Sequence, residues 1–211
     1  MPVPTSSSQA VAGIILAAGE SRRMGRDKAL LPLGQRSFLG HLAGALQGEV
    51  SPLLVVLGHH AQEIERQLPP ADALVVLRNP NYSLGQLSSL QVALRHIENL
   101  PLAGALVCLV DHPAISKEVV RLLLERFAKT QAPVLIPTCR GRRGHPVLFA
   151  RRLFRELLDA PLEEGARSVV RKHAAEVELV ETGEEGILLD IDKPEDYQAL
   201  LARREMLAES G

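Results

Sequence analysis

The chain has 211 residues, a length that suits one α/β domain or one domain with a small appendage. Its 24 basic and 25 acidic residues leave a net charge of −1, so no overall field favours DNA, RNA or an anionic membrane surface. Aromatic residues make up 3% of the chain, too few for the stacking platforms that bind single-stranded nucleic acids. We therefore expect neither nucleic-acid nor membrane partners.

The N-terminal residues and the cysteines indicate the compartment. Residues 1–9 lack the basic start and apolar stretch of a signal peptide, and we expect them to form a disordered tail. No apolar segment approaches the roughly 18 residues that a membrane span requires. Cys108 and Cys139 form neither a C-x-x-C pattern nor a disulfide framework. These features predict a cytoplasmic protein in which residues 10–207 form a single domain.

Apolar runs alternate with amphipathic segments along the whole chain. The runs predict strands over residues 14–18, 53–57, 73–77, 105–110, 134–136, 147–149 and 187–191. Helical spacing predicts helices over 38–46, 61–68, 90–97, 116–127, 150–158, 166–173 and 194–207. Ser37 is expected to cap the first helix, and Pro194 to open the last. This alternation predicts an α/β fold with a three-layer, Rossmann-like, mostly parallel sheet and helices on both faces.

The first predicted strand leads into a basic, glycine-rich loop over residues 19–28. Such a loop presents backbone N–H groups and cations to phosphate. A Walker loop requires Lys followed by Ser or Thr directly after its last glycine, whereas Lys28 lies three residues beyond Gly25. The dinucleotide pattern G-x-G-x-x-G is also absent. The loop therefore predicts a nucleotide site of a third kind, with Arg23 and Lys28 as its cations.

Further polar residues follow the other predicted strands, where ligands of parallel sheets bind. A polar loop over 79–89 follows the third strand and ends in Ser88 and Ser89, which could cap the next helix. Asp111 follows the fourth strand. Asp190 and Asp192 end the last predicted strand and would point to one face. Carboxylates opposite a cationic loop predict a site for Mg²⁺ and a nucleoside triphosphate, suited to phosphoryl or nucleotidyl transfer.

The motifs resemble those of the molybdenum cofactor nucleotidyltransferases. The pattern L-A-A-G-x-S-x-R-M-G-x-x-K spans residues 16–28, and N-P-x-Y-x-x-G-x-x-x-S spans 79–89. The resemblance continues at Asp111 and Pro113, at the Gly-His-Pro of 144–146 and at the segment 190–196. It implies the glycosyltransferase-A-like nucleotidyltransferase fold. Within that group the chain resembles the cytidylyltransferase branch, because Ala18 stands where the guanylyltransferases have glycine and would narrow the pocket toward a pyrimidine.

The resemblance implies that CMP passes from CTP to the phosphate of molybdenum-molybdopterin, releasing pyrophosphate, with Mg²⁺ as cofactor. It also allows a molybdoenzyme apoprotein as partner. The implied catalytic residues are Arg23, Lys28 and Asp111. The implied metal ligands are Asp111, Asp192 and Asp190, and one of the last two might instead cap the final helix. The implied acceptor-binding residues are His112, Gly144, His145 and Pro146. The implied nucleotide-binding residues are Leu16, Ala17, Ala18, Gly19, Ser21, Arg23, Gly25, Lys28, Asn79, Gly85, Ser88 and Ser89.

Several alternatives stay open at this point. His112 replaces the family's usual Gln, and the family's Gly-Asp-x-Gly-Ala-Arg segment reads Glu-Glu-Gly-Ala-Arg at 163–167, so the acceptor is less firmly implied than the chemistry. The donor might be GTP, or the acceptor another small phosphorylated molecule such as a sugar phosphate. A non-catalytic chaperone that delivers the cofactor is a third hypothesis. Adjacent His59 and His60 follow a strand, and we expect their side chains to diverge in a loop without binding metal.

Overall fold

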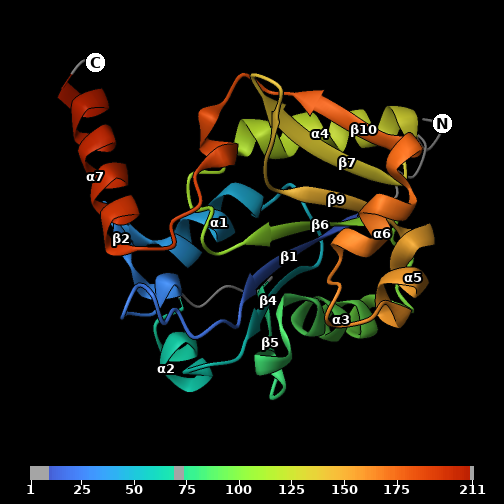
Figure 1. The fold of residues 1–211 in the computed structure, drawn as a ribbon, viewed down its shortest axis with the longest axis horizontal. Helices are drawn as coiled ribbons and strands as arrows, with labels where there is room; N and C mark the ends of the chain where they lie inside the picture. The colour runs from blue at the N-terminus through green and yellow to red at the C-terminus, as the bar shows by residue number, and fades with distance from the viewer. Residues whose placement is uncertain (1–9, 69–73, 210–211) are drawn as a thin grey trace, which may run out of the picture.

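The computed structural model describes residues 10–68 and 74–209, and the predicted tail over 1–9 lies outside them (Figure 1). In these residues an eight-stranded sheet has the order β10-β7-β9-β6-β1-β4-β5, with β8 paired to β7. Its strands are β1 (Val11–Ala17), β4 (Leu53–Leu57), β5 (Leu74–Arg78), β6 (Gly104–Leu109), β7 (Val134–Cys139), β8 (Arg142–Arg143), β9 (Val147–Ala150) and β10 (Val177–Glu181). A small hairpin is formed by β2 (Pro32–Leu33) and β3 (Arg36–Ser37).

Most neighbouring strands run parallel. β1 pairs in parallel with β4 and with β6, β4 with β5, and β10 with β7, whereas β9 is antiparallel between β6 and β7. In register, Leu16 of β1 lies beside Val56 of β4 and Leu109 of β6. The carboxyl ends of β4, β1 and β6 therefore meet at one edge of the sheet, where the polar loops begin. The predicted mostly parallel sheet is confirmed.

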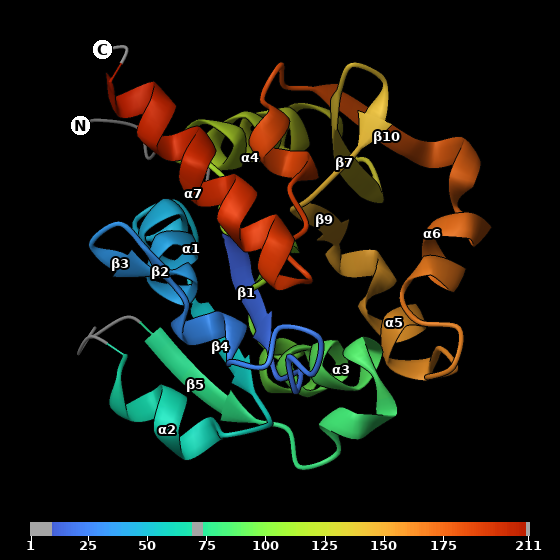
Figure 2. The same cartoon turned by 60° about the vertical axis from the view of Figure 1, so that its left-hand side comes forward.

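Helices cover both faces of the sheet (Figures 1 and 2). One layer holds α1 (Phe38–Leu46), α2 (Ala61–Arg66) and α4 (Lys117–Thr130), and the other α3 (Gln86–Ile97), α5 (Phe154–Asp159) and α6 (Arg167–Lys172). Short 3-10 helices span Lys28–Leu30, Tyr82–Leu84, Arg151–Leu153, Ala174–Glu176 and Glu185–Leu188. Along β1, Ile15 packs into one core layer and Ile14 into the other, because successive strand residues face opposite ways. The expected three-layer arrangement is therefore the observed one.

Two serines begin helices as the sequence predicts. The Ser37 hydroxyl accepts a hydrogen bond from the Gly40 amide at 3.1 Å and caps α1. The Ser116 hydroxyl accepts one from the Val119 amide at 3.1 Å and caps α4. Each bond satisfies an amide that has no partner within its own helix.

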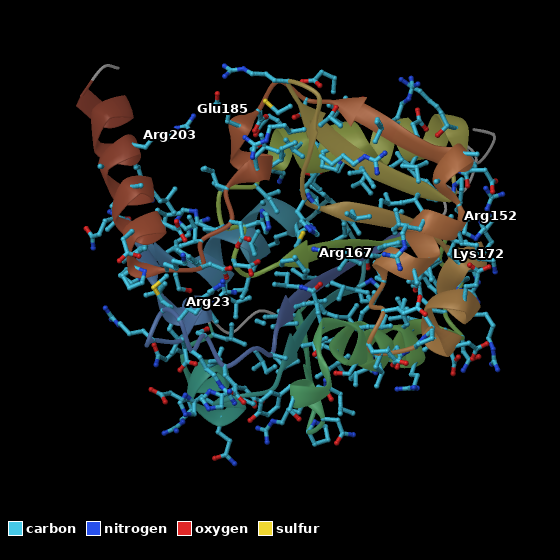
Figure 3. All side chains as sticks on the ribbon, viewed as in Figure 1. Arg23, Arg152, Arg167, Lys172, Glu185 and Arg203 are labelled. Atoms are coloured by element: carbon cyan, nitrogen blue, oxygen red, sulfur yellow. The ribbon has the colours of Figure 1, made fainter. Side chains whose placement is uncertain are left out.

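The last helix, α7 (Pro194–Glu209), lies at one side of the sheet and crosses the β2–β3 hairpin (Figures 1 and 2). Its buried Tyr197 packs edge-on against Phe38, with ring centroids 5.8 Å apart, and donates a hydrogen bond to the Pro32 carbonyl at 2.6 Å. Arg203 of α7 forms an ion pair with Glu185 (Figure 3). Met24, in the basic loop, belongs to the same small core as Tyr197. Helix α7 therefore anchors one end of that loop.

The predicted strand over 187–191 is wrong. Ile187 belongs to the 3-10 helix Glu185–Leu188, and the segment from Leu189 to Lys193 has no regular structure. The apolar spacing has another cause, because Ile187 packs into the main core under the sheet whereas Ile191 packs against α7. The last strand is β10, which the sequence does not reveal, since only Val180 among its five residues is buried.

Other boundaries also differ from the predicted ones. Helix α3 begins at Gln86 instead of residue 90, so Ser88 and Ser89 lie inside the helix and do not cap it. The predicted helix over 150–158 divides into a 3-10 turn and α5. The predicted strand start at 73 lies outside the described residues. In residues 10–68 and 74–209, no helix has the length and apolar character to cross a membrane.

Candidate active site

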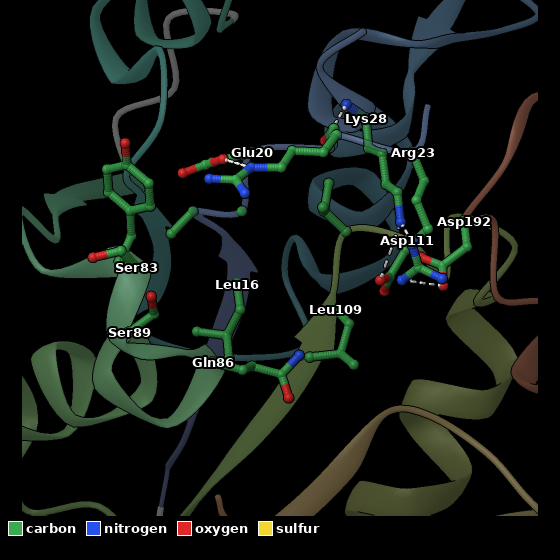
Figure 4. Close-up of a pocket in the computed structure, with 16 residues that line it drawn as sticks. Leu16, Glu20, Arg23, Lys28, Ser83, Gln86, Ser89, Leu109, Asp111 and Asp192 are labelled. Atoms are coloured by element: carbon green, nitrogen blue, oxygen red, sulfur yellow. Dashed lines mark hydrogen bonds and ion pairs between the residues drawn. The ribbon is translucent and has the colours of Figure 1, made fainter. Parts of the chain in front are cut away.

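A cleft of about 520 Å³ lies over the carboxyl ends of β1 and β6 (Figure 4). This volume is in the range of small-molecule sites in proteins. Its walls come from the basic loop, from the start of α3 and from the segment before α7. The lining residues are Leu16, Ala18, Gly19, Glu20, Ser21, Arg22, Arg23, Lys28, Tyr82, Ser83, Gln86, Ser89, Leu109, Val110, Asp111 and Asp192. The cleft therefore joins parts of the chain that are far apart in sequence.

Ser21 organises the basic loop. Its backbone adopts a left-handed conformation with φ of 52°, and its carbonyl accepts hydrogen bonds from the amides of Met24 and Gly25, both at 3.0 Å. Its hydroxyl accepts a third bond, from the Lys28 amide at 3.1 Å. The loop is thereby folded into a compact turn whose far end carries Lys28 toward the cleft. The Ser21 side chain lines the cleft but is already engaged within the loop.

The cationic side chains of the loop meet Asp192 at one end of the cleft (Figure 4). Lys28 Nζ lies 2.5 Å from Asp192 Oδ1 and 3.6 Å from Asp111 Oδ2, and its side chain is 10% exposed. Arg23 donates to Asp192 Oδ2 at 2.8 Å. The hydrogen bond from Lys28, followed by the charges of Lys28 and Arg23, lowers the pKa of Asp192. This end of the cleft therefore brings two cations and two carboxylates together.

Asp111 is held by the segment that carries the other carboxylates. The Ile191 amide donates a hydrogen bond to the Asp111 carbonyl at 2.9 Å. In the described residues, Asp111 Oδ1 is buried without a hydrogen-bond partner, and it lies 4.0 Å from His112 Nε2. One ligand atom each of Asp111, His112 and Asp190 lie within 4.8 Å of one another. Burial, followed by the negative charges of Asp111 and Asp192, raises the pKa of Asp190. The three aspartates therefore repel one another around a point that a cation would neutralise.

Asp190 and Asp192 do not share one strand face, contrary to the prediction. Asp192 lines the cleft and contacts Lys28, whereas Asp190 lies behind Asp111 and is not among the lining residues. Neither carboxylate caps α7. Instead, Asp196 in the first turn of α7 accepts hydrogen bonds from the amides of Asp192 at 3.1 Å and Lys193 at 2.9 Å, which precede the helix.

The opposite end of the cleft has little charge. It is formed by Leu16 of β1 and Leu109 of β6 together with Ser83, Gln86 and Ser89 from the start of α3 and the turn before it (Figure 4). Sequence reasoning did not single out Ser83 or Gln86, because the helix was expected to begin four residues later. Because α3 begins at Gln86, residues 86 and 89 are one helical turn apart and lie on the same side of the helix.

Glu20 and Arg22 form an ion pair on the edge of the cleft. The hydrogen bond from Arg22 lowers the pKa of Glu20. The sequence analysis did not assign a role to either residue, since both fall at variable positions of the motif over 16–28. The basic loop therefore contributes a carboxylate as well as cations.

Asn79 and Ser88 support the cleft but do not line it. Asn79 is 2% exposed, and its amide donates to the hydroxyls of Ser88 at 2.8 Å and Ser89 at 3.0 Å, while its side-chain oxygen accepts from the Asn81 amide at 2.9 Å. The Ser88 hydroxyl donates to the backbone of Gly85 or Asn81. These polar groups hold the turn before α3 in place. The predicted nucleotide contacts of Ala17, Gly25 and Gly85 involve residues that also lie outside the lining of the cleft.

The residues predicted to bind the acceptor form a block beside Asp111, not on the cleft itself. The rings of His112 and His145 lie 4.7 Å apart, centroid to centroid, and within the described part of the chain neither buried Nδ1 atom has a hydrogen-bond partner. Burial, then the nearby His112, lowers the pKa of His145 to about 3. At Gly144, a Cβ atom would lie 2.4 Å from the Ile187 carbonyl oxygen. Gly144 and Pro146 thus belong to a tightly packed connection that supports the segment with Asp190 and Asp192.

Comparisons with known proteins agree with this architecture. A probable molybdenum cofactor guanylyltransferase of Mycobacterium avium is 31% identical over 202 residues, which cover 94% of this chain and 99% of that protein. The crystal structure of Rv0371c from Mycobacterium tuberculosis has a TM-score of 0.81 at 26% identity, covering 93% of this chain and all of the other. The molybdopterin-guanine dinucleotide biosynthesis protein A of Archaeoglobus fulgidus, at 18% identity and a TM-score of 0.70, shares the fold.

The model of the MobA-like NTP transferase domain matches residues 13–177. These residues contain the basic loop, the start of α3 and Asp111, and the carboxylates of 190–192 follow the matched region. Together with the full-length relative, the match defines the protein as a nucleotidyltransferase. The chain belongs to the family of MobA-like NTP transferase domains.

Proposed function

We propose that the protein transfers GMP from GTP to the phosphate of a molybdopterin cofactor and releases pyrophosphate. The observation that carries this proposal is the similarity, over 94% of the chain, to a relative named as a molybdenum cofactor guanylyltransferase. The sequence favoured CTP through Ala18, but Ala18 is only 6% exposed, so its methyl group is largely covered by protein. Although Ala18 lines the cleft, we propose that its methyl group leaves room for a purine base.

The charge distribution in the cleft orients the nucleotide. The triphosphate belongs at the end with Arg23 and Lys28, because fixed cations there neutralise the charge that develops on phosphate oxygens during transfer. The base belongs at the opposite end, between Leu16, Leu109 and the polar groups of Gln86 and Ser89. This orientation places the phosphates beside Asp111 and directs the acceptor to the side of His112 and His145.

The carboxylates at the triphosphate end of the cleft suit the binding of a Mg²⁺ ion. Asp111 and Asp192 both line the cleft and share the Lys28 ammonium, which stands where a cation would balance them. Asp111 also has a buried oxygen without a partner, and carboxylate oxygens are the ligands that Mg²⁺ prefers. We assign the metal to Asp111 and Asp192, with Asp190 behind them. When bound, Mg²⁺ would neutralise the triphosphate and help to align the attacking and leaving oxygens.

In the reaction, an oxygen of the acceptor phosphate attacks the α-phosphorus of GTP, forms a new P–O bond and displaces pyrophosphate. The acceptor phosphate needs no base at neutral pH, since its oxygens are already ionised. Lys28 and Arg23 have to leave Asp192 in order to reach the phosphates, and their long side chains permit that shift. The contribution of this chain is therefore positioning and charge neutralisation, without a covalent intermediate.

Pyrophosphate release tests the proposal. We expect release with molybdopterin and GTP, and much less with CTP. Lys28→Ala should lower both GTP binding and turnover, whereas Arg26→Ala should leave both unchanged, because Arg26 is exposed and does not line the cleft. Faster release with CTP than with GTP would restore the cytidylyltransferase hypothesis. Cofactor binding without pyrophosphate release for either nucleotide would favour the chaperone hypothesis.

The metal assignment has a separate test in the matched variants Asp192→Asn and Asp190→Asn. Titration with Mn²⁺, followed by the loss of its free EPR signal, reports binding without turnover. We expect Asp192→Asn to weaken Mn²⁺ binding in the presence of a non-hydrolysable GTP analogue and Asp190→Asn to affect it far less. If Asp190→Asn weakened Mn²⁺ binding more than Asp192→Asn, the metal would instead be assigned to Asp190 and His112.

A further inference from the structure

Three side chains away from the active-site carboxylates form a compact group of metal-binding type. They are Asp27, at the end of the basic loop, and His59 and His60, which follow β4. We propose that these residues bind a transition-metal ion of the Zn²⁺ class at a site separate from the Mg²⁺ site. The site is independent of which nucleotide the enzyme uses.

The geometry of the three donors is close to that of a tetrahedral zinc site. His60 Nδ1 lies 2.9 Å from Asp27 Oδ2, and His59 Nδ1 lies 3.8 Å from Asp27 Oδ1. One donor atom from each residue falls within 4.8 Å of the other two. Ligands bound to Zn²⁺ at about 2.0–2.1 Å are about 3.3 Å apart in a tetrahedron, a value between the two observed separations. Small side-chain shifts would therefore complete three of four coordination positions.

The two histidines do not diverge, contrary to the expectation from their adjacent positions after a strand. Their ring centroids are 3.7 Å apart, because His60 adopts a left-handed backbone conformation with φ of 51° directly before α2. This conformation is uncommon for residues other than glycine, although asparagine, aspartate and histidine adopt it more often than the rest. It turns the His60 ring back so that both Nδ1 atoms face the Asp27 carboxylate.

The donor chemistry selects the class of ion. Two imidazole nitrogens and one carboxylate oxygen suit Zn²⁺ and similar ions, whereas Mg²⁺ prefers oxygen ligands alone. Among the residues that the structure describes, none forms a hydrogen bond with the buried His59 Nδ1, so this atom has a lone pair or a proton without a partner there. His60 lines a second hollow of about 650 Å³ with Glu63 and Tyr82, which offers a route for the ion and space for a fourth ligand.

A metal here would join the basic loop to the end of β4. Asp27 immediately precedes Lys28, and the His59 amide donates a hydrogen bond to the Ala18 carbonyl at 3.1 Å. A bound ion would therefore clamp the basic loop to the end of β4 and fix the approach of Lys28 to the cleft. Without the ion, the Asp27–His60 hydrogen bond already links the same two segments.

Co²⁺ is a suitable probe, because tetrahedral Co²⁺ has intense visible absorption bands that octahedral Co²⁺ lacks. We expect metal-free protein titrated with CoCl₂ to develop these bands at one ion per chain, and ZnCl₂ to displace them. In a His59→Gln/His60→Asn double variant, the affinity should fall by at least roughly 10-fold, since even the loss of an outer-shell partner weakens metal sites by that amount. Asn is chosen because it tolerates the left-handed conformation.

Two control variants separate this site from other histidines. His96→Asn alters an exposed helix residue, and His112→Asn alters the second cluster with Asp111 and Asp190, so both should keep the bands. Circular dichroism in EDTA checks the fold of each variant, and the isosteric Asp27→Asn replaces the double variant if that one does not fold. Absence of the bands in the wild-type protein, their survival in the folded variant, or their loss in His112→Asn would overturn the proposal.

Discussion

The buried histidine of the acceptor block, His145, makes the stability of the protein depend on pH. Burial beside His112 lowers its pKa from 6.5 to about 3, so the ring stays neutral in the folded protein at pH 5. In the unfolded chain the same ring takes up a proton below about pH 6.5. Because the unfolded state then binds more protons than the folded state, acidification between pH 6.5 and pH 3 destabilises the fold.

The magnitude follows from the pKa difference. At pH 5 the solution is about 1.5 pH units below the pKa of His145 in the unfolded chain, and each unit corresponds to about 1.36 kcal/mol. The free energy of unfolding should therefore fall by about 2 kcal/mol through His145 alone. A His145→Gln variant lacks the titrating group, and its own fall over the same interval should be smaller by this amount.

Urea denaturation of both proteins at pH 7 and pH 5 measures the effect. The carboxylates titrate in both proteins, so the difference between the two pH-induced changes isolates His145. The absolute stability of the variant does not matter, because only the pH dependence is compared. Equal losses in the two proteins would show that the ring is protonated in the folded state, and would refute the account of its burial.

Three substitutions test the packing around the cleft. Asn79→Ala removes three hydrogen bonds and should lower the free energy of unfolding by roughly 3 kcal/mol in urea, while Asn81→Ala, whose side chain makes no capping bond, should change it by less than about 0.5 kcal/mol. Gly144→Ala places a Cβ against the Ile187 carbonyl and should cost about 1–3 kcal/mol in thermal unfolding, whereas Gly19→Ala meets no atom within 4 Å and should cost less. Ser116→Ala removes the cap of α4 and should cost about 1 kcal/mol without changing pyrophosphate release. Unchanged stability in Asn79→Ala, equal costs at the two glycines, or altered turnover in Ser116→Ala would each contradict the corresponding role.

The central strands were predictable from sequence because they are buried on both faces. The apolar runs at 53–57 and 105–110 coincide closely with β4 and β6, whose residues have no polar face to interrupt the pattern. Strand β10 was not predictable in this way. It lies at the edge of the sheet, and its charged residues Glu178 and Glu181 face outward or contact side chains of neighbouring elements.

The segment 187–191 shows how an apolar pattern can mislead. Its isoleucines are buried, as strand residues would be, but they enter two different cores on either side of an irregular turn. Local sequence does not reveal that division, since it depends on where α7 packs. The wrong strand prediction also led to a wrong expectation for the site. Because the backbone is irregular, Asp192 contacts Lys28, whereas Asp190 lies near Asp111.

The kind of chemistry at the candidate site could be predicted better than the contacts of its individual residues. Lys28, Arg23 and Asp111 lie on one cleft, as their positions after β1 and β6 indicate, and their individual roles stay predictions. Asp192 lies on the same cleft, although the strand expected before it does not form. The buried hydrogen bonds of Asn79 could not be predicted, because the side-chain amide of an asparagine in a polar motif can bind either a ligand or neighbouring groups of the protein. Gln86 was missed since its place on α3 depends on the exact start of that helix.

The side chains that line the cleft neutralise one another before any ligand arrives. Three cations, Arg22, Arg23 and Lys28, lie with three carboxylates, Glu20, Asp111 and Asp192, in ion pairs across or within its walls. Simple anions such as inorganic phosphate must break an existing pair to bind, and gain little by doing so. Asp192 thus acts as an internal competitor for phosphate, and only a ligand that engages several of these groups at once can displace it.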